Sequence, residues 1–369
     1  MKLHTKIISL SGAGLLLVLL AIFIRPGADE AVPAAAAATG ERIETSPQES
    51  ESETAESSSA PETEKDYIKW VDFNVPMEAL QLAYEYDVNS VSEPVHLNWI
   101  WLLSYTASRY GGEFPAAALS FMRETAGQVL NGEADPEALS QDQKYFSYYQ
   151  EAYHAVLGGM VGSYQIQLED GTWEKRYGLK AFSPIAKGFD YSDYDDFGVA
   201  RSYGYRRQHL GHDMMGLTGT PIIAVESGTV EALGWNQYGG WRIGIRSFDQ
   251  KRYYYYAHLR QNVPFQSGLK EGSIVQAGDV IGYMGHTGYS AKENTNNIDE
   301  THLHFGLQLI FDESQKEGNN EIWIDCYQLI QFLKRNRCTV VRNDESKEWS
   351  RAVPFRDEGL PELPCLYPQ

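Results

Sequence analysis

The chain has 369 residues, of which 43% are hydrophobic and 12% aromatic, and its formal net charge is −19. This length accommodates two domains with flanking tails, and the aromatic content can supply a packed core. So acidic a chain lacks the basic footprint of a nucleic-acid-binding protein, and we expect no nucleic-acid partner.

The first residues predict a membrane segment, because an uncharged apolar run over residues 7–24 follows Lys2 and Lys6. Its length is near the lower limit for a helix that spans a bilayer, and basic residues ahead of it place the N-terminus inside. We therefore expect residues 1–27 to be a single-pass anchor in the cell membrane, with the bulk of the chain extracytoplasmic. The alternative is secretion after signal cleavage, since small residues follow at 34–38.

Residues 28–65 predict a disordered linker. They consist mainly of Ala, Glu, Ser, Thr and Pro, with almost no large apolar side chains. A segment of this composition cannot bury enough apolar surface to offset the entropy of ordering it. We expect it to be a solvated tether between the membrane and the folded part of the chain.

The next stretch, residues 66–165, predicts an α-helical domain. Its helical patterns, bounded by Gly and Pro signals, cover residues 79–86, 95–110, 115–130 and 147–157. Glu113 is a candidate acid, but no second carboxylate of matching context accompanies it. We therefore expect a regulatory or wall-positioning domain, which a protein regulator could bind, rather than a muramidase. His96 and His154 are expected to be packed residues or residues at the rim of the domain.

Residues 166–200 form a connecting segment before the next domain. Its acidic and aromatic run at residues 190–197 lacks the glycine and the terminal glutamate of an EF-hand calcium loop. We expect a solvated loop that packs against the following module or over its groove.

Residues 201–312 alternate short β-type runs with glycine-containing turns, which predicts an all-β module of antiparallel strands, arranged as a sheet or sandwich. Within it, residues 301–309 alternate between apolar and polar, as in a strand. His302 and His304 should then point from one face, and Leu303 and Phe305 from the other. Two imidazoles on one face suit a metal with a proton acceptor beside it.

A second group of metal-binding residue types lies upstream. If residues 209–213 are extended, His209 and Asp213 share a face, and Gly211 between them leaves room for an ion. Together with His304 they would give three ligands and an open fourth position, which is the pattern of a catalytic zinc site.

A third histidine, His258, lies near the end of a strand-like run. In chain order the sequence thus carries Ser202-Tyr203-Gly204-Tyr205-Arg206, His209-x-Gly211-x-Asp213, Tyr256-Ala257-His258-Leu259 and His302-Leu303-His304-Phe305. Over about residues 200–312 these motifs resemble the lysostaphin/LytM-type zinc metallopeptidases. Several ordered motifs together are specific, although a single one would not be.

The resemblance implies that His209, Asp213 and His304 bind one Zn²⁺ ion in a zinc peptidase module, and that His258 and His302 assist catalysis. It implies hydrolysis of peptide bonds in bacterial peptidoglycan, in stem peptides or cross-links, through a zinc-activated water. His302 is the expected base and His258 its partner, although the two could exchange roles. The alternative is a catalytically inert relative that serves as a scaffold or as an activator of other cell-wall hydrolases.

Three further residues of the module are assigned lesser roles. Tyr205 is a candidate for stabilising the oxyanion. His212 has the opposite parity to the two proposed ligands nearby and should point away from the metal. His286 lies in a glycine-rich turn and is expected to be a polar turn residue.

The module departs from the family pattern in two places. Residues 290–301 form an insertion before the histidine strand, and we expect it to be a mobile wall of the substrate groove. Gly306 stands where a glutamate is common. Both departures bear on the shape of the groove, and neither removes a ligand.

Residues 313–369 form a C-terminal extension. A helical pattern covers residues 321–336, and the chain from Pro354 is expected to be irregular. Three cysteines, Cys326, Cys338 and Cys365, cannot form a complete internal disulfide framework. Two alternatives are left open: Cys326 and Cys338 form a disulfide, or the cysteines are buried or tail thiols.

Overall fold

The computed structural model describes residues 67–202, 206–316 and 320–358, all of which belong to one compact unit, Glu64–Gln369. The predicted anchor at residues 1–27 and the linker at 28–65 lie outside the described residues. Within the described ranges, no helix is long and apolar enough to cross a membrane.

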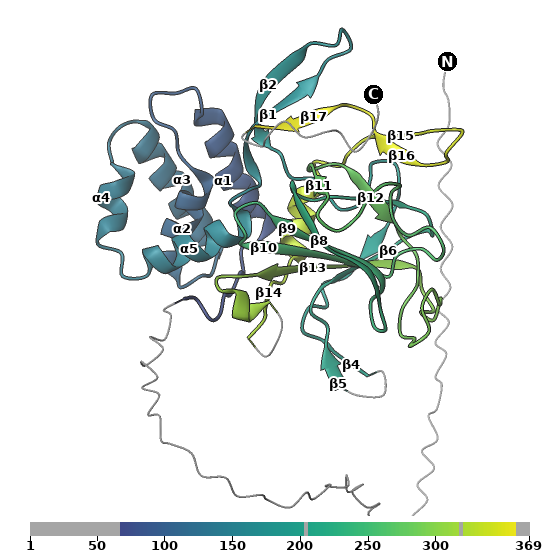
Figure 1. The fold of residues 1–369 in the computed structure, drawn as a ribbon. Coiled ribbons are helices and arrows are strands. Elements are labelled where there is room, and N and C mark those ends of the chain that lie inside the picture. The colour runs from purple at the N-terminus through teal and green to yellow at the C-terminus, as the bar shows by residue number, and fades with distance from the viewer. Residues whose placement is uncertain (1–66, 203–205, 317–319, 359–369) are drawn as a thin grey trace, which may run out of the picture. The chain divides into compact units, whose positions relative to one another are not determined.

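Helices come first in the described chain (Figure 1). They are α1 (Met77–Ser90), α2 (Trp99–Tyr110), α3 (Ala116–Leu130), α4 (Pro136–Gln141) and α5 (Phe146–Leu157). Four of them confirm the sequence prediction, and α4 was not predicted. Its six residues are too few for an apolar period to stand out.

Helix α2 begins four residues later than predicted, because Asn98 caps it. The Asn98 side chain accepts hydrogen bonds from the backbone N–H groups of Ile100 and Trp101, at 3.0 and 3.1 Å. An asparagine N-cap satisfies amides that have no partner within the helix. Gly111 ends the helix in the left-handed conformation (φ 67°), as predicted from the sequence.

The main sheet has eight strands and confirms the predicted antiparallel β module. Its order is β11-β8-β9-β10-β13-β6-β3, with β14 paired to β13, and Figure 1 shows β8, β9, β10 and β13 side by side. The strands are β3 (Ser192–Asp193), β6 (His212–Met215), β8 (Gly228–Asn236), β9 (Gly240–Ser247), β10 (Arg252–Ala257), β11 (Ile274–Val275), β13 (His302–Leu309) and β14 (Ile322–Trp323). Strand β13 lies between β10 and β6, so the histidine motif is central.

The described residues also form four smaller sheets. They contain β1 (Val161–Gln167), β2 (Trp173–Leu179) and β17 (Phe355–Asp357); β7 (Pro221–Ile223) and β12 (Val280–Tyr283); β15 (Val340–Arg342) and β16 (Trp349–Arg351); and β4 (Ala200–Ser202) and β5 (Arg206–Gln208). The prediction of an irregular chain from Pro354 is wrong for β17. Its Phe355 pairs with Ile166 of β1, a partner too distant in the sequence for any local pattern to reveal.

The predicted helix over residues 321–336 is only partly correct. The helix α6 (Tyr327–Leu333) is present, but residues 322–323 form β14 instead, and a short 3₁₀ helix, η1 (Glu313–Gln315), precedes it. Strand β14 pairs Ile322 with Leu309 of β13. The free hydrogen-bonding edge near the end of β13 therefore outweighs the local helical pattern.

A buried ion pair joins α5 to the sheet. Arg252 is 1% exposed, and its Nε and Nη2 donate to Glu226 at 2.7 and 3.0 Å. Its Nη1 donates to the carbonyl of Ala155 at 2.8 Å, near the end of α5. One hydrophobic core, which includes Leu103 of α2 and Tyr254 of β10, also continues from the helices into the sheet. The division of the chain into six segments stays a prediction.

Candidate metal centre

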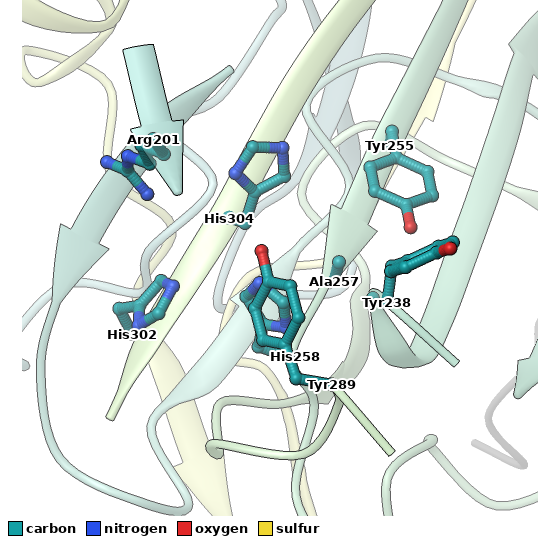
Figure 2. Close-up of a pocket in the computed structure, with 9 residues that line it drawn as sticks. Arg201, Tyr238, Tyr255, Ala257, His258, Tyr289, His302 and His304 are labelled. Carbon is teal, nitrogen blue, oxygen red and sulfur yellow. The ribbon is translucent and has the colours of Figure 1, made fainter. Parts of the chain in front are cut away.

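Strand β13 places two histidines on one face, as its alternation predicts. Leu303 and Phe305 are 0% and 1% exposed on the other face, and burying such a side chain contributes about 1.5–3 kcal/mol. This burial fixes the strand, so His302 and His304 both face the pocket drawn in Figure 2. His304 lies opposite Asp213 of β6 in the antiparallel register.

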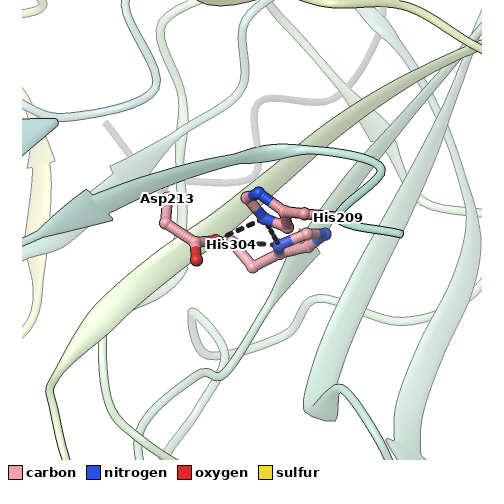
Figure 3. Close-up of side chains that lie close together, drawn as sticks. All are labelled: His209, Asp213 and His304. Carbon is pink, nitrogen blue, oxygen red and sulfur yellow. Dashed lines mark hydrogen bonds and ion pairs between the residues drawn. The ribbon is translucent and has the colours of Figure 1, made fainter. Parts of the chain in front are cut away.

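Three side chains converge beside this register (Figure 3). Asp213 Oδ1 lies 2.8 Å from His304 Nδ1 and 3.1 Å from His209 Nε2, and those two nitrogens are 3.1 Å apart. All three predicted metal ligands are therefore brought together. The predicted extended run over residues 209–213 is wrong, however, because β6 begins only at His212.

Gly211 makes this convergence possible. A Cβ atom at this position would lie 2.5 Å from Cε1 and 2.6 Å from Nε2 of His304. Any side chain would therefore displace the imidazole. The predicted role of Gly211, to leave space between His209 and Asp213, holds even though the segment is not a strand.

The three side chains fit a divalent metal such as zinc. Two imidazole nitrogens and one carboxylate oxygen are typical zinc donors, and ligands about 2.0–2.1 Å from a tetrahedral ion lie about 3.3 Å from each other. The observed separations of 2.8–3.1 Å need only a small outward movement. Burial raises the pKa of Asp213, but its hydrogen bonds with His209 and His304 outweigh this effect and hold the pKa well below its ordinary value. The carboxylate is therefore ionised, as a metal ligand must be.

Asp196 and Arg201 hydrogen-bond to two of the ligands and orient them. Neither residue was singled out from the sequence. His209 Nδ1 donates to Asp196 Oδ1 at 3.0 Å, which leaves Nε2 with the lone pair for a metal. Arg201 Nη1 donates to Asp213 Oδ2 at 2.7 Å and pairs with Asp196 as well. The acidic run at residues 190–197, which contains Asp196, was the signal in the sequence that could have identified it. From the sequence, this run was predicted only to pack against the module or over its groove.

His258 and His302 lie beside the three ligands, and each ring donates through Nδ1, as His209 does. His302 Nδ1 donates to the carbonyl of Glu300 at 2.8 Å, and His258 Nδ1 donates to the carbonyl of Thr287 at 2.9 Å. Donation through Nδ1 leaves the lone pair on Nε2 in both neutral rings. Both imidazoles line the pocket of Figure 2, so both can accept a proton there.

The backbone at His258 is unusual for a residue other than glycine. Its φ is 62°, in the left-handed region that side chains disfavour. Hydrogen bonds hold it, since the N–H of His258 donates to the carbonyl of Gly239 at 2.8 Å and its carbonyl accepts from Gly285 at 3.0 Å. This strained turn at the end of β10 directs the imidazole into the pocket.

Burial keeps two of these imidazoles neutral. Burial, reinforced by the neighbouring His302 and His304, lowers the pKa of His258 well below its ordinary value. Burial also lowers the pKa of His304, more than the nearby Asp213 raises it. Neutral imidazoles are the forms that bind metals and accept protons.

Tyrosines complete the pocket that contains His258 and His302. Tyr238, Tyr255 and Tyr289 line it, together with Arg201. In Figure 2 the Tyr289 hydroxyl points toward the space between His302 and His304. Tyr289 was not singled out from the sequence, although the glycine-rich turn around it was noted. The predicted oxyanion helper, Tyr205, lies outside the described residues.

The remaining histidines lie elsewhere. His212 is 2% exposed, and its Nε2 donates to Asp193 at 3.1 Å, away from the three ligands, as its parity predicts. His286 Nδ1 donates to the carbonyl of Ile298 at 2.8 Å. His96 Nε2 contacts the buried Asp87 at 2.9 Å in the helical region. None of the three contributes to the convergent cluster.

Residues 207–317 match the family described as Peptidase family M23. The chain contains a peptidase family M23 domain. This confirms the resemblance inferred from the ordered histidine motifs. The match covers the metal centre and the main sheet strands β6, β8, β9, β10 and β13.

Parts of the chain are similar to curated relatives. The chain is 41% identical over 152 residues to the L-Ala–D-Glu endopeptidase of Bacillus subtilis, an alignment that covers 41% of this chain and 43% of that one. It is 37% identical over 98 residues to lysostaphin of Staphylococcus simulans, covering 26% and 17%. The chain spans less than half of the length of either relative.

Solved structures resemble it as well. A putative glycyl-glycine endopeptidase LytM from Ruminococcus gnavus has a TM-score of 0.48 and 22% identity, covering 73% of this chain and 93% of that one. The lysostaphin catalytic domain from Staphylococcus simulans has a TM-score of 0.30 and 29% identity, covering 38% and 92%.

The insertion at residues 290–301 in the M23 domain is held by its own hydrogen bonds. Asn294 Oδ1 accepts from Trp241 Nε1 at 2.9 Å and from the N–H of Asn262 at 2.8 Å. The carbonyl of Asn294 accepts from Gln261 at 2.6 Å. These contacts tie the middle of the insertion to β9 and to the turn after β10. The hypothesis that the insertion is a mobile wall of the groove stays a prediction.

Cys326 and Cys338 of the C-terminal extension do not form the disulfide that the sequence left open. Cys326 and Cys338 are both free and buried. Burial raises the pKa of the Cys338 thiol to about 11 and raises that of Cys326 further. Cys365 lies outside the described residues.

Proposed function

We propose that the chain is a zinc-dependent endopeptidase that hydrolyses peptide bonds of bacterial peptidoglycan. The observation that carries the proposal is that two sets of imidazoles lie side by side, with ring centroids 5.0 Å apart for His209 and His304 and 5.8 Å apart for His258 and His304. His209 and His304 converge with Asp213 as ligands, whereas His258 and His302 hold their Nδ1 atoms on backbone carbonyls and direct Nε2 to the pocket. A catalytic zinc site needs both an open coordination position and a proton acceptor beside it.

The proposed chemistry divides the work among these residues. When bound by His209, Asp213 and His304, zinc supplies Lewis acidity that activates water and polarises a peptide carbonyl. His302 accepts the proton at Nε2, and His258 assists it from the adjacent ring. The Tyr289 hydroxyl, which faces the same space, donates a hydrogen bond to the oxygen that gains charge.

The substrate proposal rests on the curated relatives. The relative with 41% identity is named for the L-Ala–D-Glu bond, so this bond of the stem peptide is the first candidate. The rival function is an inert scaffold or activator of other wall hydrolases. The three proposed ligands and the two proposed proton acceptors are all present, and their hydrogen bonds are compatible with these roles. This favours the enzyme over the scaffold.

The deciding experiment measures the zinc content of the purified protein and the peptides that it releases from isolated cell walls. We expect one zinc ion per chain and new amino termini that mass spectrometry assigns to the cut bond. Zinc-loaded protein that releases no peptide from walls of several peptide compositions would favour the scaffold.

We also propose that the chain is exported and anchored in the cell membrane by residues 1–27, with residues 28–65 as the tether. The apolar run with basic residues ahead of it supports this. The full-length protein should pellet with membranes, and an external protease should reach its folded part. Recovery of a mature chain that begins within residues 34–39 would show a cleaved signal instead.

A further inference from the structure

A second pocket continues from the metal centre on the side away from His258 and His302. It contains about 1490 Å³ of space, part of it open to solvent, and we call it the Arg242 groove. It shares Tyr238, Tyr255 and His304 with the pocket of Figure 2. A peptide whose reacting bond lies at the metal centre would therefore extend into this groove.

Aromatic side chains form the walls of the Arg242 groove. Tyr255 of β10 packs edge-on against Trp323 of β14, with ring centroids 6.2 Å apart. Trp323 covers Gly306, because a Cβ at that position would lie 2.6 Å from the Trp323 ring. The glycine at position 306, which departs from the family pattern, thus leaves the space that Trp323 occupies. The aromatic walls can pack against the apolar parts of a peptide.

Arg242 is the unusual member of the groove. It lies on β9 opposite Gly234 of β8, and its Nε is buried, yet no described residue accepts a hydrogen bond from that atom. The other cations nearby have partners, since Lys316 pairs with Glu231 and Arg246 pairs with Glu231 and Glu313. Among the described residues, no carboxylate forms an ion pair with Arg242.

Arg242 is partly exposed as a residue, but its buried Nε has no hydrogen-bond partner among the described residues, and a ligand that accepts from this atom would remove that cost. A carboxylate fits best, because the planar guanidinium can donate two parallel hydrogen bonds to its two oxygens. Glu321 and Lys316 also line the groove, and Lys316 is paired with Glu231. Of the lining residues that the structure describes, Arg242 is therefore the cation that is left to attract an acidic group of a ligand.

We propose that Arg242 binds a free carboxylate of the substrate peptide, next to the bond that is cut. The inference rests on the proposed peptidase function for the identity of its substrate. It assigns the chain a preference for an acidic residue whose carboxylate is free over the same residue as a carboxamide. Arg242 is a specificity residue, and it takes no part in the proton transfer assigned to His302.

Binding measurements with two stem peptides test this directly. The peptides are identical except that the α-carboxylate of D-Glu in one is a carboxamide in the other. Calorimetry is performed on full-length, zinc-loaded protein that carries His302→Ala, so that hydrolysis does not consume the peptide. We expect the carboxylate peptide to bind about tenfold or more tightly, the usual contribution of a charged hydrogen bond.

The variant Arg242→Gln should abolish this difference by weakening only the carboxylate peptide, and Arg242→Lys should keep part of it. The control Lys270→Gln removes a positive charge at an exposed position and should keep the full difference in affinity between the two peptides. Equal binding of the two peptides, binding of neither, or an unchanged preference in Arg242→Gln overturns the inference. If Arg242→Gln does not fold, the smaller change Arg242→Lys decides, and full retention of the preference there counts against the carboxylate contact.

Wall hydrolysis by the protein with His302 intact separates this inference from the proposed function. Hydrolysis without a carboxylate preference would overturn the Arg242 contact alone. A carboxylate preference without hydrolysis would support the contact and count against the enzyme.

Discussion

His258 and His302 face each other edge-to-face, with ring centroids 4.8 Å apart, and each ring donates its Nδ1 hydrogen to a backbone carbonyl. His209 also donates its Nδ1 hydrogen, to the Asp196 carboxylate, so Nε2 keeps the lone pair in all three rings. Position separates the roles, because His209 Nε2 lies 3.1 Å from Asp213 Oδ1, whereas His302 Nε2 lies 3.8 Å from Asp213 Oδ2. We therefore assign metal binding to the convergent cluster and proton transfer to the two histidines beside it.

This separation predicts different outcomes for alanine variants. His209→Ala and His304→Ala each remove one of three ligands, so both zinc and activity should be lost. His302→Ala and His258→Ala should keep zinc while hydrolysis falls by roughly two to four orders of magnitude, the usual contribution of general base catalysis. Zinc stoichiometry and peptide release from cell walls measure the two effects independently.

The control for these variants is His212→Ala. His212 is buried against Asp193 and Tyr327, so this variant should keep zinc and most activity while losing stability. A His302→Ala protein without zinc, beside a His304→Ala protein that retains it, would invert the assignment.

The sequence predicts the strand histidines because the information is local. His302 and His304 alternate with Leu303 and Phe305, and two-residue periodicity alone places them on one face. The same holds for His258 at the end of a β-type run. The conformation at His209 was wrongly predicted to be extended. The prediction that Gly211 leaves room between His209 and Asp213 does not depend on that conformation, because glycine has no side chain.

The sequence does not predict contacts that depend on distant parts of the chain. Asp196 lies 13 residues before His209 in an irregular segment, so no period links them. Strand β17 pairs with β1, which lies far earlier in the chain, and residues 322–323 form the strand β14 because β13 offers a free edge. Hydrogen bonds to distant strands make β14 and β17 strands, although the local sequence predicts a helix at the first and an irregular chain at the second.

Asp196→Ala should weaken zinc binding without removing a ligand. The carboxylate holds the His209 ring and fixes which nitrogen faces the metal, and loss of such a partner typically lowers metal affinity by about 10–100-fold. Competition with a chelator of known affinity measures the change. Asp195→Ala is the matched control, because it removes an exposed neighbouring carboxylate and should leave affinity unchanged. Equal affinities of the two variants would refute an orienting role for Asp196.

Glu226→Gln should destabilise the helices and the sheet together. It leaves the Arg252 guanidinium buried without its main counter-charge, which typically costs about 3–5 kcal/mol. Urea unfolding followed by circular dichroism measures the loss. Glu174→Gln, which breaks the exposed pair with Arg176, should change stability by no more than about 1 kcal/mol. Similar losses in both variants would show that the buried pair adds no more stability than an exposed one.

Gly306→Glu tests the relationship between the glycine and Trp323. The new side chain would meet the tryptophan ring, since even its Cβ would lie 2.6 Å away, so we expect a loss of about 1–3 kcal/mol from overpacking and a shift in tryptophan fluorescence. Trp323→Ala removes the obstruction, so the double variant should be more stable than the sum of the two single losses predicts. Strictly additive losses in a double-mutant cycle, measured by urea unfolding, would mean that Trp323 does not occupy the space over Gly306.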